Sequence, residues 1–122
     1  MFEKIGPNRV RSSWGFEVSV RSRATQIYVE YRAGDHVIRF DNTMNALGYP
    51  GFTFRPKHIT HWAPPFESEL LGPEKRKLVI ENMAAALDFL GVTSDALDEQ
   101  AKVIGVFGSK GWVWKDEKWL SE

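Results

Sequence analysis

Cysteine is missing from all 122 positions of the sequence. Its absence excludes disulfide bonds, thiolate metal sites, iron–sulfur clusters and cysteine nucleophiles. A chain that forms no disulfides suits a reducing compartment, so we expect a cytoplasmic protein.

Long apolar runs and an excess of charge of either sign are also missing. No stretch approaches the roughly 18 consecutive apolar residues of a membrane-spanning helix, and residues 1–7 contain no apolar segment of signal-peptide length. The 16 Lys and Arg residues are balanced by 16 Asp and Glu residues, which excludes a polybasic mode of binding to nucleic acid or to anionic membranes. We therefore expect a soluble protein that has no membrane partner.

The sequence is rich in the side chains that build a hydrophobic core. Hydrophobic residues make up 43% of the chain and aromatic residues 13%, which is typical of a folded protein and excludes intrinsic disorder. Because 122 residues is the size of one ordinary domain, we expect a single α+β domain over residues 1–122. Within it, residues 108–122 are compatible with a terminal hairpin or with a less ordered tail.

Alternation of apolar and polar residues predicts β-strands in the first part of the chain. In residues 13–20 every even position is apolar and every odd position is small or polar, which is the period of a strand with one buried face. Residues 26–32 and 36–41 repeat this pattern on either side of a short loop that contains Gly34. These two segments therefore predict a β-hairpin.

Proline and glycine divide the segment that follows. Residues 49–51 have the Pro-Gly sequence of a type II turn. The strand-like residues 52–62 come next and are interrupted at Pro56, and Pro64 with Pro65 then ends this part of the chain. A proline lacks the N–H that a strand needs, so we expect the chain to change character there.

One long helix is predicted after this point. Pro73 suits the first helical position after Gly72, Glu74 is favoured in the first turn, and Gly91 is a typical C-terminal stop. Four apolar residues recur at spacings of 3, 4 and 3 and form one stripe, as in an amphipathic helix. They are Ile80, Met83, Leu87 and Leu90.

Two shorter elements complete the prediction. Residues 93–95 are able to cap a second, shorter helix that extends to Gln100, and residues 103–107 predict a strand. The whole pattern indicates an α+β fold, in which an antiparallel β-sheet, a meander of about four to six strands, has one long α-helix packed on one face. The expected core consists of Trp14, Phe16, Val18, Val20, Ile27, Val29, Tyr31, Ile38, Phe40, Ile59, Ile80, Met83 and Leu87.

No arrangement of residues indicates catalysis, a metal or a cofactor. His58 and His61 point to opposite faces if they lie on a strand, so we reject a metal site there. Residues 105–111 resemble a phosphate loop, but Lys110 stands where the Walker spacing requires Gly. We expect a protein that is not an enzyme and has no cofactor. An enzyme would instead need a concave site around one of these histidines or His36.

Charge is unevenly distributed along the chain. Residues 1–63 carry 9 basic and 5 acidic side chains, a net charge of +4, whereas residues 64–122 carry 7 and 11, a net charge of −4. Arginines interleaved with aromatic residues in the first part favour an alternative function, a nucleic-acid-binding sheet on which bases stack. Several of these aromatics are needed for the core, including Phe16 and Tyr31, so we do not expect nucleic acid to be the partner.

Acidic residues flank both ends of the predicted helix. They form either an ordinary solvated face or a docking surface for a basic partner, since complementary charge accelerates and selects association. The candidate partner-binding residues are Glu67, Glu69, Glu74, Asp88, Asp95, Asp98 and Glu99.

The strand end before the helix carries a resemblance to a known family. Its sequence, Ile59-Thr60-His61-Trp62-Ala63-Pro64-Pro65, is followed by an acidic spacer and a helix that contains Asn82. This order resembles the immunity protein 74 family of bacterial polymorphic-toxin and contact-dependent inhibition systems, over residues 27–92. The resemblance implies a small cytoplasmic protein that binds the C-terminal toxin domain delivered by a neighbouring cell and blocks it by occlusion.

The resemblance also sets expectations for individual residues and for assembly. It implies a monomer that forms a one-to-one complex with the cognate toxin domain, without turnover or cofactor. The acidic residues from Glu67 onward are the interface if the toxin is basic, and the arginine-bearing sheet is the interface if the toxin is acidic. We expect structural roles for the motif residues, with Trp62 covering the sheet edge. These residues are Ile59, Trp62, Pro64, Pro65, Pro73 and Asn82.

Overall fold

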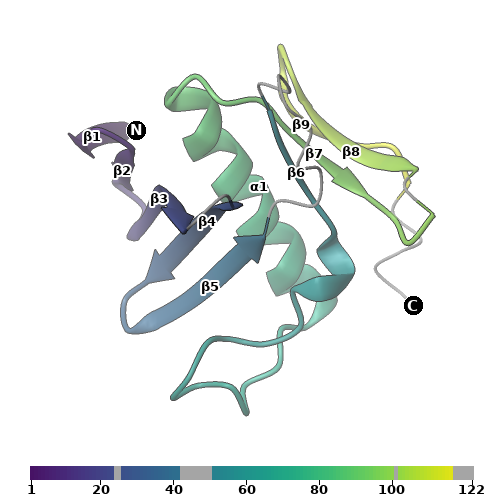
Figure 1. Cartoon of the computed structure of the whole chain (residues 1–122), viewed down its shortest axis with the longest axis horizontal. Coiled ribbons are helices and arrows are strands. Elements are labelled where there is room, and N and C mark those ends of the chain that lie inside the picture. Colours follow the sequence, from purple (N-terminus) through teal and green to yellow (C-terminus); the bar gives the residue numbers. More distant parts are fainter. Residues whose placement is uncertain (24–25, 42–50, 101, 117–122) are drawn as a thin grey trace.

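The computed structural model of the chain describes residues 1–23, 26–41, 51–100 and 102–116. It contains two β-sheets and one long helix, α1, that contacts strands of both (Figure 1). The predicted α+β class is confirmed, with an antiparallel sheet and a helix packed on one of its faces. The second sheet was not foreseen from the sequence.

The first sheet is an antiparallel meander whose strands follow one another in the chain. It has five strands in the order β1-β2-β3-β4-β5. Their bounds are Phe2–Gly6, Arg9–Ser12, Phe16–Arg23, Gln26–Ala33 and His36–Asp41. The hairpin predicted from residues 26–32 and 36–41 is confirmed as β4 and β5, with Val29 opposite Phe40 and Tyr31 opposite Ile38.

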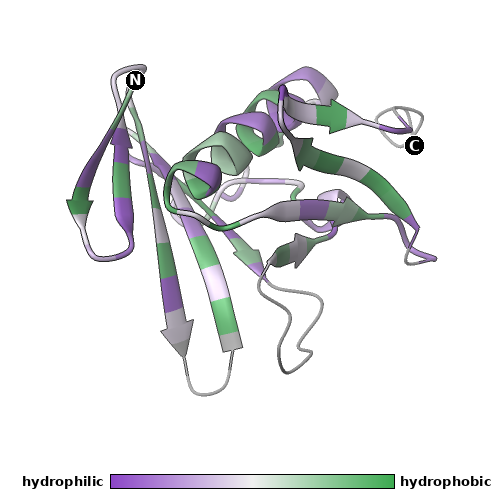
Figure 2. Cartoon of the chain, turned by 90° about the horizontal axis from the view of Figure 1, so that it is seen from above, coloured by the Kyte–Doolittle hydropathy of each residue, from purple (hydrophilic) through white to green (hydrophobic). Residues whose placement is uncertain are grey.

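The alternating pattern places the inner face of this sheet correctly along most of its length. Phe16, Val18 and Val29 are buried as predicted, and Val20 is half-buried. Two predicted core residues are wrong. Trp14 is 75% exposed because it lies in the turn before β3, next to Gly15 with φ +94°. Ile27 is 47% exposed because β3 and β4 extend away from the helix at their shared end (Figure 2).

The second sheet joins segments that are far apart in the sequence. Its order is β6-β7-β8-β9, with β6 parallel to β7 and the other pairs antiparallel. The bounds are Phe52–Phe54, Ser94–Leu97, Val103–Gly108 and Gly111–Trp114. The strand predicted over residues 103–107 is confirmed as β8, and β9 forms a hairpin with it within the segment 108–122, for which both a terminal hairpin and a less ordered tail were compatible with the sequence.

The second helix predicted from residue 93 to Gln100 is wrong. Ser94, Ala96 and Leu97 are buried in strand β7. Strand β7 lies between β6 and β8, and this tertiary pairing overrides the local helix-capping signal. The strand-like residues 52–62 are also shorter than expected, because Pro56 begins the 3₁₀ helix η1 (Pro56–His58) directly after β6.

The long helix is confirmed as α1 (Pro73–Phe89). Gly72 is its N-cap, Pro73 its first residue, and Gly91 adopts φ +81° just after its end. The buried positions follow the predicted stripe and include Ile80, Met83 and Leu87. A membrane-spanning helix is not found among the described residues, since none combines the length and the apolar character required.

Buried residues of both sheets and of α1 form one continuous cluster. Phe40 of β5 and Phe54 of β6 join the two sheets directly, with ring centroids 5.5 Å apart in an edge-to-face arrangement. Most of the turn predicted over residues 49–51 and all of residues 117–122 lie outside the described residues.

Candidate functional site

The segment between η1 and α1 forms a loop whose two ends are fastened together. His61 and Leu70 form an isolated antiparallel bridge, and the backbone N–H of Leu71 donates to the carbonyl oxygen of Thr60 at 2.8 Å. Residues 63–70, which include Glu67 and Glu69, are called the acidic loop below. The loop stands at the bottom of the molecule as drawn in Figure 1.

Backbone hydrogen bonds hold the acidic loop against the first sheet. The N–H of Ala63 donates to the carbonyl oxygen of Val37 in β5 at 2.8 Å. Inside the loop, the N–H of Phe66 donates to Ala63 at 3.0 Å and that of Glu69 donates to Phe66 at 2.9 Å. The Pro64-Pro65 peptide bond is cis. The loop is therefore tied to β5 and also bonded within itself.

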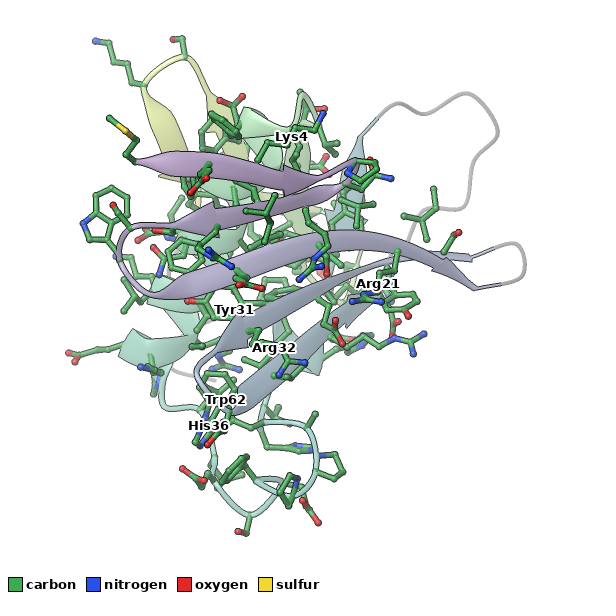
Figure 3. The ribbon with its side chains drawn as sticks, turned by 90° about the vertical axis from the view of Figure 1, so that its left-hand side faces the viewer. Lys4, Arg21, Tyr31, Arg32, His36 and Trp62 are labelled. Carbon is green, nitrogen blue, oxygen red and sulfur yellow. The ribbon has the colours of Figure 1, made fainter. Side chains whose placement is uncertain are left out.

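Aromatic side chains fix the same loop from the side of β5. The His36 ring stacks on Phe66 with centroids 3.8 Å apart and meets Trp62 edge to face at 5.0 Å. His36 Nε2 lies 3.0 Å from Glu69 Oε2. Figure 3 shows His36 and Trp62 together at the start of the loop, below Arg32. The sequence named His36 only as a candidate for an enzyme site, and it did not single out Phe66, whose only signal is an aromatic residue among prolines and acids.

The acidic loop presents both charge and apolar surface to solvent. Glu67 and Glu69 are exposed, and Leu70 is 77% exposed. Protein interfaces combine an apolar centre with a polar rim, and this loop has both within four residues. Such a surface is suited to contact with another protein. Leu70 had not been singled out from the sequence, because an isolated apolar residue in a loop carries no periodic signal.

The structure does not gather the seven predicted partner-binding acids into one patch. Glu74 is in the first turn of α1 and Asp88 in the last, so the two lie about 21 Å apart along the helix axis. Asp95 accepts a hydrogen bond from Thr53 Oγ1 at 2.6 Å. Asp98 accepts the backbone N–H groups of Lys102 and Gln100. These contacts give Asp95 and Asp98 roles within the second sheet.

Backbone hydrogen bonds at Asp98 also change its acidity. The backbone N–H of Lys102 makes the largest contribution to stabilising the carboxylate, and the backbone N–H of Gln100 makes a further one. Together they lower the pKa of Asp98 below its ordinary value of 3.8. Glu99 beside it is exposed, at the turn between β7 and β8. Of the seven acids, Glu67 and Glu69 therefore share the acidic loop, and Asp98 and Glu99 share the turn between β7 and β8.

Four of the six motif residues lie in the core, at the start of α1 or in a contact between α1 and β4. Ile59 and Trp62 are buried in the core, and Pro73 begins α1. Asn82 Nδ2 donates to the hydroxyl of Tyr31 at 3.2 Å and links α1 to β4. Burial raises the pKa of Tyr31, and the bond from Asn82 opposes that effect. Pro64 and Pro65 differ, because both are exposed in the acidic loop.

On the outer face of the first sheet, arginine side chains are interspersed with carboxylates. Arg9 and Arg11 both reach Glu17, at 3.4 and 3.2 Å. Arg21 pairs with Glu30 at 3.0 Å. Of the five arginines of β2–β5 whose side chains the structure describes, Arg32 alone has no carboxylate partner within 4.0 Å among the described residues. These carboxylates reduce the positive potential that a polyanion would meet.

The surroundings of His58 and His61 offer little that catalysis or metal binding requires. His58 and His61 are exposed, and His61 Nδ1 lies 2.9 Å from the hydroxyl of its neighbour Thr60. Within the described ranges, no three His, Asp or Glu side chains are placed to hold a metal ion.

No family model, curated protein or solved structure matches the chain. The resemblance to the immunity protein 74 family therefore remains a prediction based on the motif at residues 59–65.

Proposed function

We propose that this chain is a cytoplasmic immunity protein that binds a bacterial toxin domain through the acidic loop and blocks it by occlusion. The observation that supports the proposal most directly is the loop itself. It is tied to β5, closed at its base, and presents Glu67, Glu69 and Leu70 to solvent. No catalytic step or cofactor is part of this function.

Rigidity of the loop favours tight binding. A loop that is flexible when free loses conformational entropy on association, and a loop already held in shape avoids most of that loss. The hydrogen bond from Ala63 to Val37 and the stacking of Phe66 on His36 provide such pre-organisation. The free protein thus presents a loop that has little conformational entropy left to lose on binding.

The charge of the loop selects the kind of partner. Glu67 and Glu69 lie on either side of exposed Ser68, and Leu70 follows at once. Carboxylates around an apolar contact suit a partner surface that is basic with an apolar depression. A toxin domain with a basic active-site cleft has this character, and covering the cleft would exclude its substrate.

A co-expression experiment tests the function. The chain is expressed with the C-terminal domain of the protein encoded immediately upstream, cell growth is followed, and the purified pair is titrated by calorimetry. We expect rescue of growth and a one-to-one complex with a nanomolar Kd. Failure of both rescue and binding would contradict the proposal.

Paired variants test the loop separately from the function. Glu67→Lys combined with Leu70→Ala should weaken binding by about 100-fold or more, because truncated interface anchors and reversed charges act together. Asp88→Lys combined with Glu99→Lys makes a larger change of charge outside the loop and should alter Kd by less than about 3-fold. Equal effects of the two pairs would place the interface elsewhere while leaving immunity supported.

A further inference from the structure

A small crevice lies at the opposite end of β5 from the acidic loop. Its volume is about 50 Å³. Arg39 and Asp41 line it from β5, and Arg55 and His58 line it from the segment that joins β6 to η1. Phe40 and Phe54, which pack edge to face beneath it, form its apolar floor. The crevice therefore lies where the two sheets meet.

Arg55 lines this crevice and also carries an unsatisfied donor. Its Nε is buried and has no hydrogen-bond partner among the described residues. The backbone of Arg55 is fixed, because its carbonyl oxygen accepts the N–H of His58 at 3.0 Å and Pro56 follows it in η1. A buried donor without an acceptor destabilises the folded state, and does so more strongly when the group is charged. Such a group in a folded protein requires an explanation, and an anion bound to the terminal nitrogens of the same guanidinium would compensate its charge.

A second guanidinium group and an imidazole line the same space. The Nε of Arg39 donates to Asp41 Oδ1 at 2.9 Å, and its guanidinium carbon lies 4.0 Å from the centre of the Tyr28 ring. This contact with Asp41 uses one nitrogen and leaves the two terminal nitrogens of Arg39 as donors. His58 is exposed at the rim. Two guanidinium groups and an imidazole thus face one carboxylate that is already paired.

We propose that this crevice binds a phosphate group, either as the free anion or as a monoester on a small molecule. One water requires about 10–15 Å³, so the crevice has room for about three to five waters, a range that includes the four oxygens of one phosphate. The planar donor set of Arg is suited to phosphate oxygens. The phosphate would accept one terminal N–H of Arg55 and one of Arg39, because Arg55 Nε itself is enclosed. This site does not depend on the proposed immunity function.

Titration of the whole chain with sodium phosphate tests the site. Proton–nitrogen NMR spectra are recorded at constant ionic strength, with sodium chloride replacing phosphate. We expect saturable shifts of the Arg55 Nε–H signal and of the backbone amides of Arg39, Asp41 and His58. Shifts that do not saturate, or that chloride reproduces, would overturn the proposal.

Matched variants separate a specific site from general charge. Arg55→Gln should raise the Kd for phosphate by about 10-fold or more, because it removes a charge-assisted hydrogen bond. Arg32→Gln removes the same charge from the outer face and should leave the Kd unchanged. Equal effects of the two variants would contradict the site.

Two further measurements complete the test. If Arg55→Gln does not fold, His58→Ala at the exposed rim should still weaken phosphate binding by about 3-fold or more, and no change would count against the site. Phenyl phosphate is titrated in parallel with inorganic phosphate. Tighter binding of the monoester identifies a phosphorylated small molecule as the ligand, and tighter binding of inorganic phosphate identifies the free anion.

Discussion

The two sheets of this protein are built in different ways. The strands of the first sheet are consecutive in the chain and all antiparallel, whereas the second sheet pairs β6 with β7 across 39 intervening residues that include α1. The first sheet has one buried face and one solvated face, and the three residues of β6 are all buried. Local alternation therefore encodes the first sheet, and long-range packing encodes the second.

Aromatic packing has a different role in each sheet. In the first sheet, Phe16 stacks on Tyr31 within the inner face, at 5.2 Å. In the second, the ring of Trp112 contacts both Phe54 and Trp114. Trp114 Nε1 also donates to Glu81 of α1 at 2.9 Å. The last strand of the second sheet, β9, is thus bonded to the helix. No periodic pattern in the sequence indicates this contact.

The largest effect is expected from a substitution that breaks the junction between the two sheets. Phe54→Ala removes a fully buried ring that contacts Phe40 of the first sheet and Trp112 of the second. Loss of such a ring should lower the free energy of unfolding by about 3–5 kcal/mol. Urea denaturation measures the change. Phe107→Ala, a half-buried control in β8, should lower the free energy of unfolding clearly less. An equal loss for both variants would contradict the role of Phe54 in joining the two sheets.

A smaller effect is expected where the second sheet has no room for a side chain. A Cβ at Gly105 would lie 2.5 Å from Cζ2 of Trp112 and 3.0 Å from Cε3 of Trp114. Gly105→Ala should therefore lower the free energy of unfolding by about 1–3 kcal/mol, as overpacking does. Gly108→Ala in the same strand is the control, since its nearest atom is 3.9 Å away. Thermal unfolding that ranks both variants equally would refute the close contact.

The contact of the helix with the first sheet should have a more modest effect. Asn82→Ala removes the hydrogen bond to the Tyr31 hydroxyl and should cost about 0.5–1.5 kcal/mol. A double-mutant cycle with Tyr31→Phe isolates the interaction from the loss of packing. Additive effects of the two substitutions would show that this bond does not couple α1 to β4.

The smallest effect depends on pH and concerns the turn of the second sheet. Because the pKa of Asp98 is lowered in the folded state, its contribution to stability is present above pH 3.8 and is lost as the pH falls through the lowered value. The difference in stability between the wild type and Asp98→Asn should therefore shrink between pH 5 and pH 2. Urea denaturation across this range measures it. Glu99→Gln is the adjacent control, and a difference independent of pH would refute the assignment.

The sequence predicted the candidate site only in part. Glu67 and Glu69 were chosen for their charge, and they do share the acidic loop. Asp95 was chosen for the same reason but is engaged with Thr53, 42 positions earlier in the chain. Charge is visible in a sequence, whereas its use in an internal hydrogen bond depends on which strands become neighbours.

The sequence by itself determined the elements whose signals are local. The alternation in β3 to β5 and the Gly-Pro start and Gly end of α1 each lie within one continuous segment. Tertiary structure decided the pairing of β6 with β7, the closure of the acidic loop on β5 and the position of Arg55 beside Arg39. These features arise from contacts between segments that are distant in the sequence, and such a contact leaves no periodic trace in either segment.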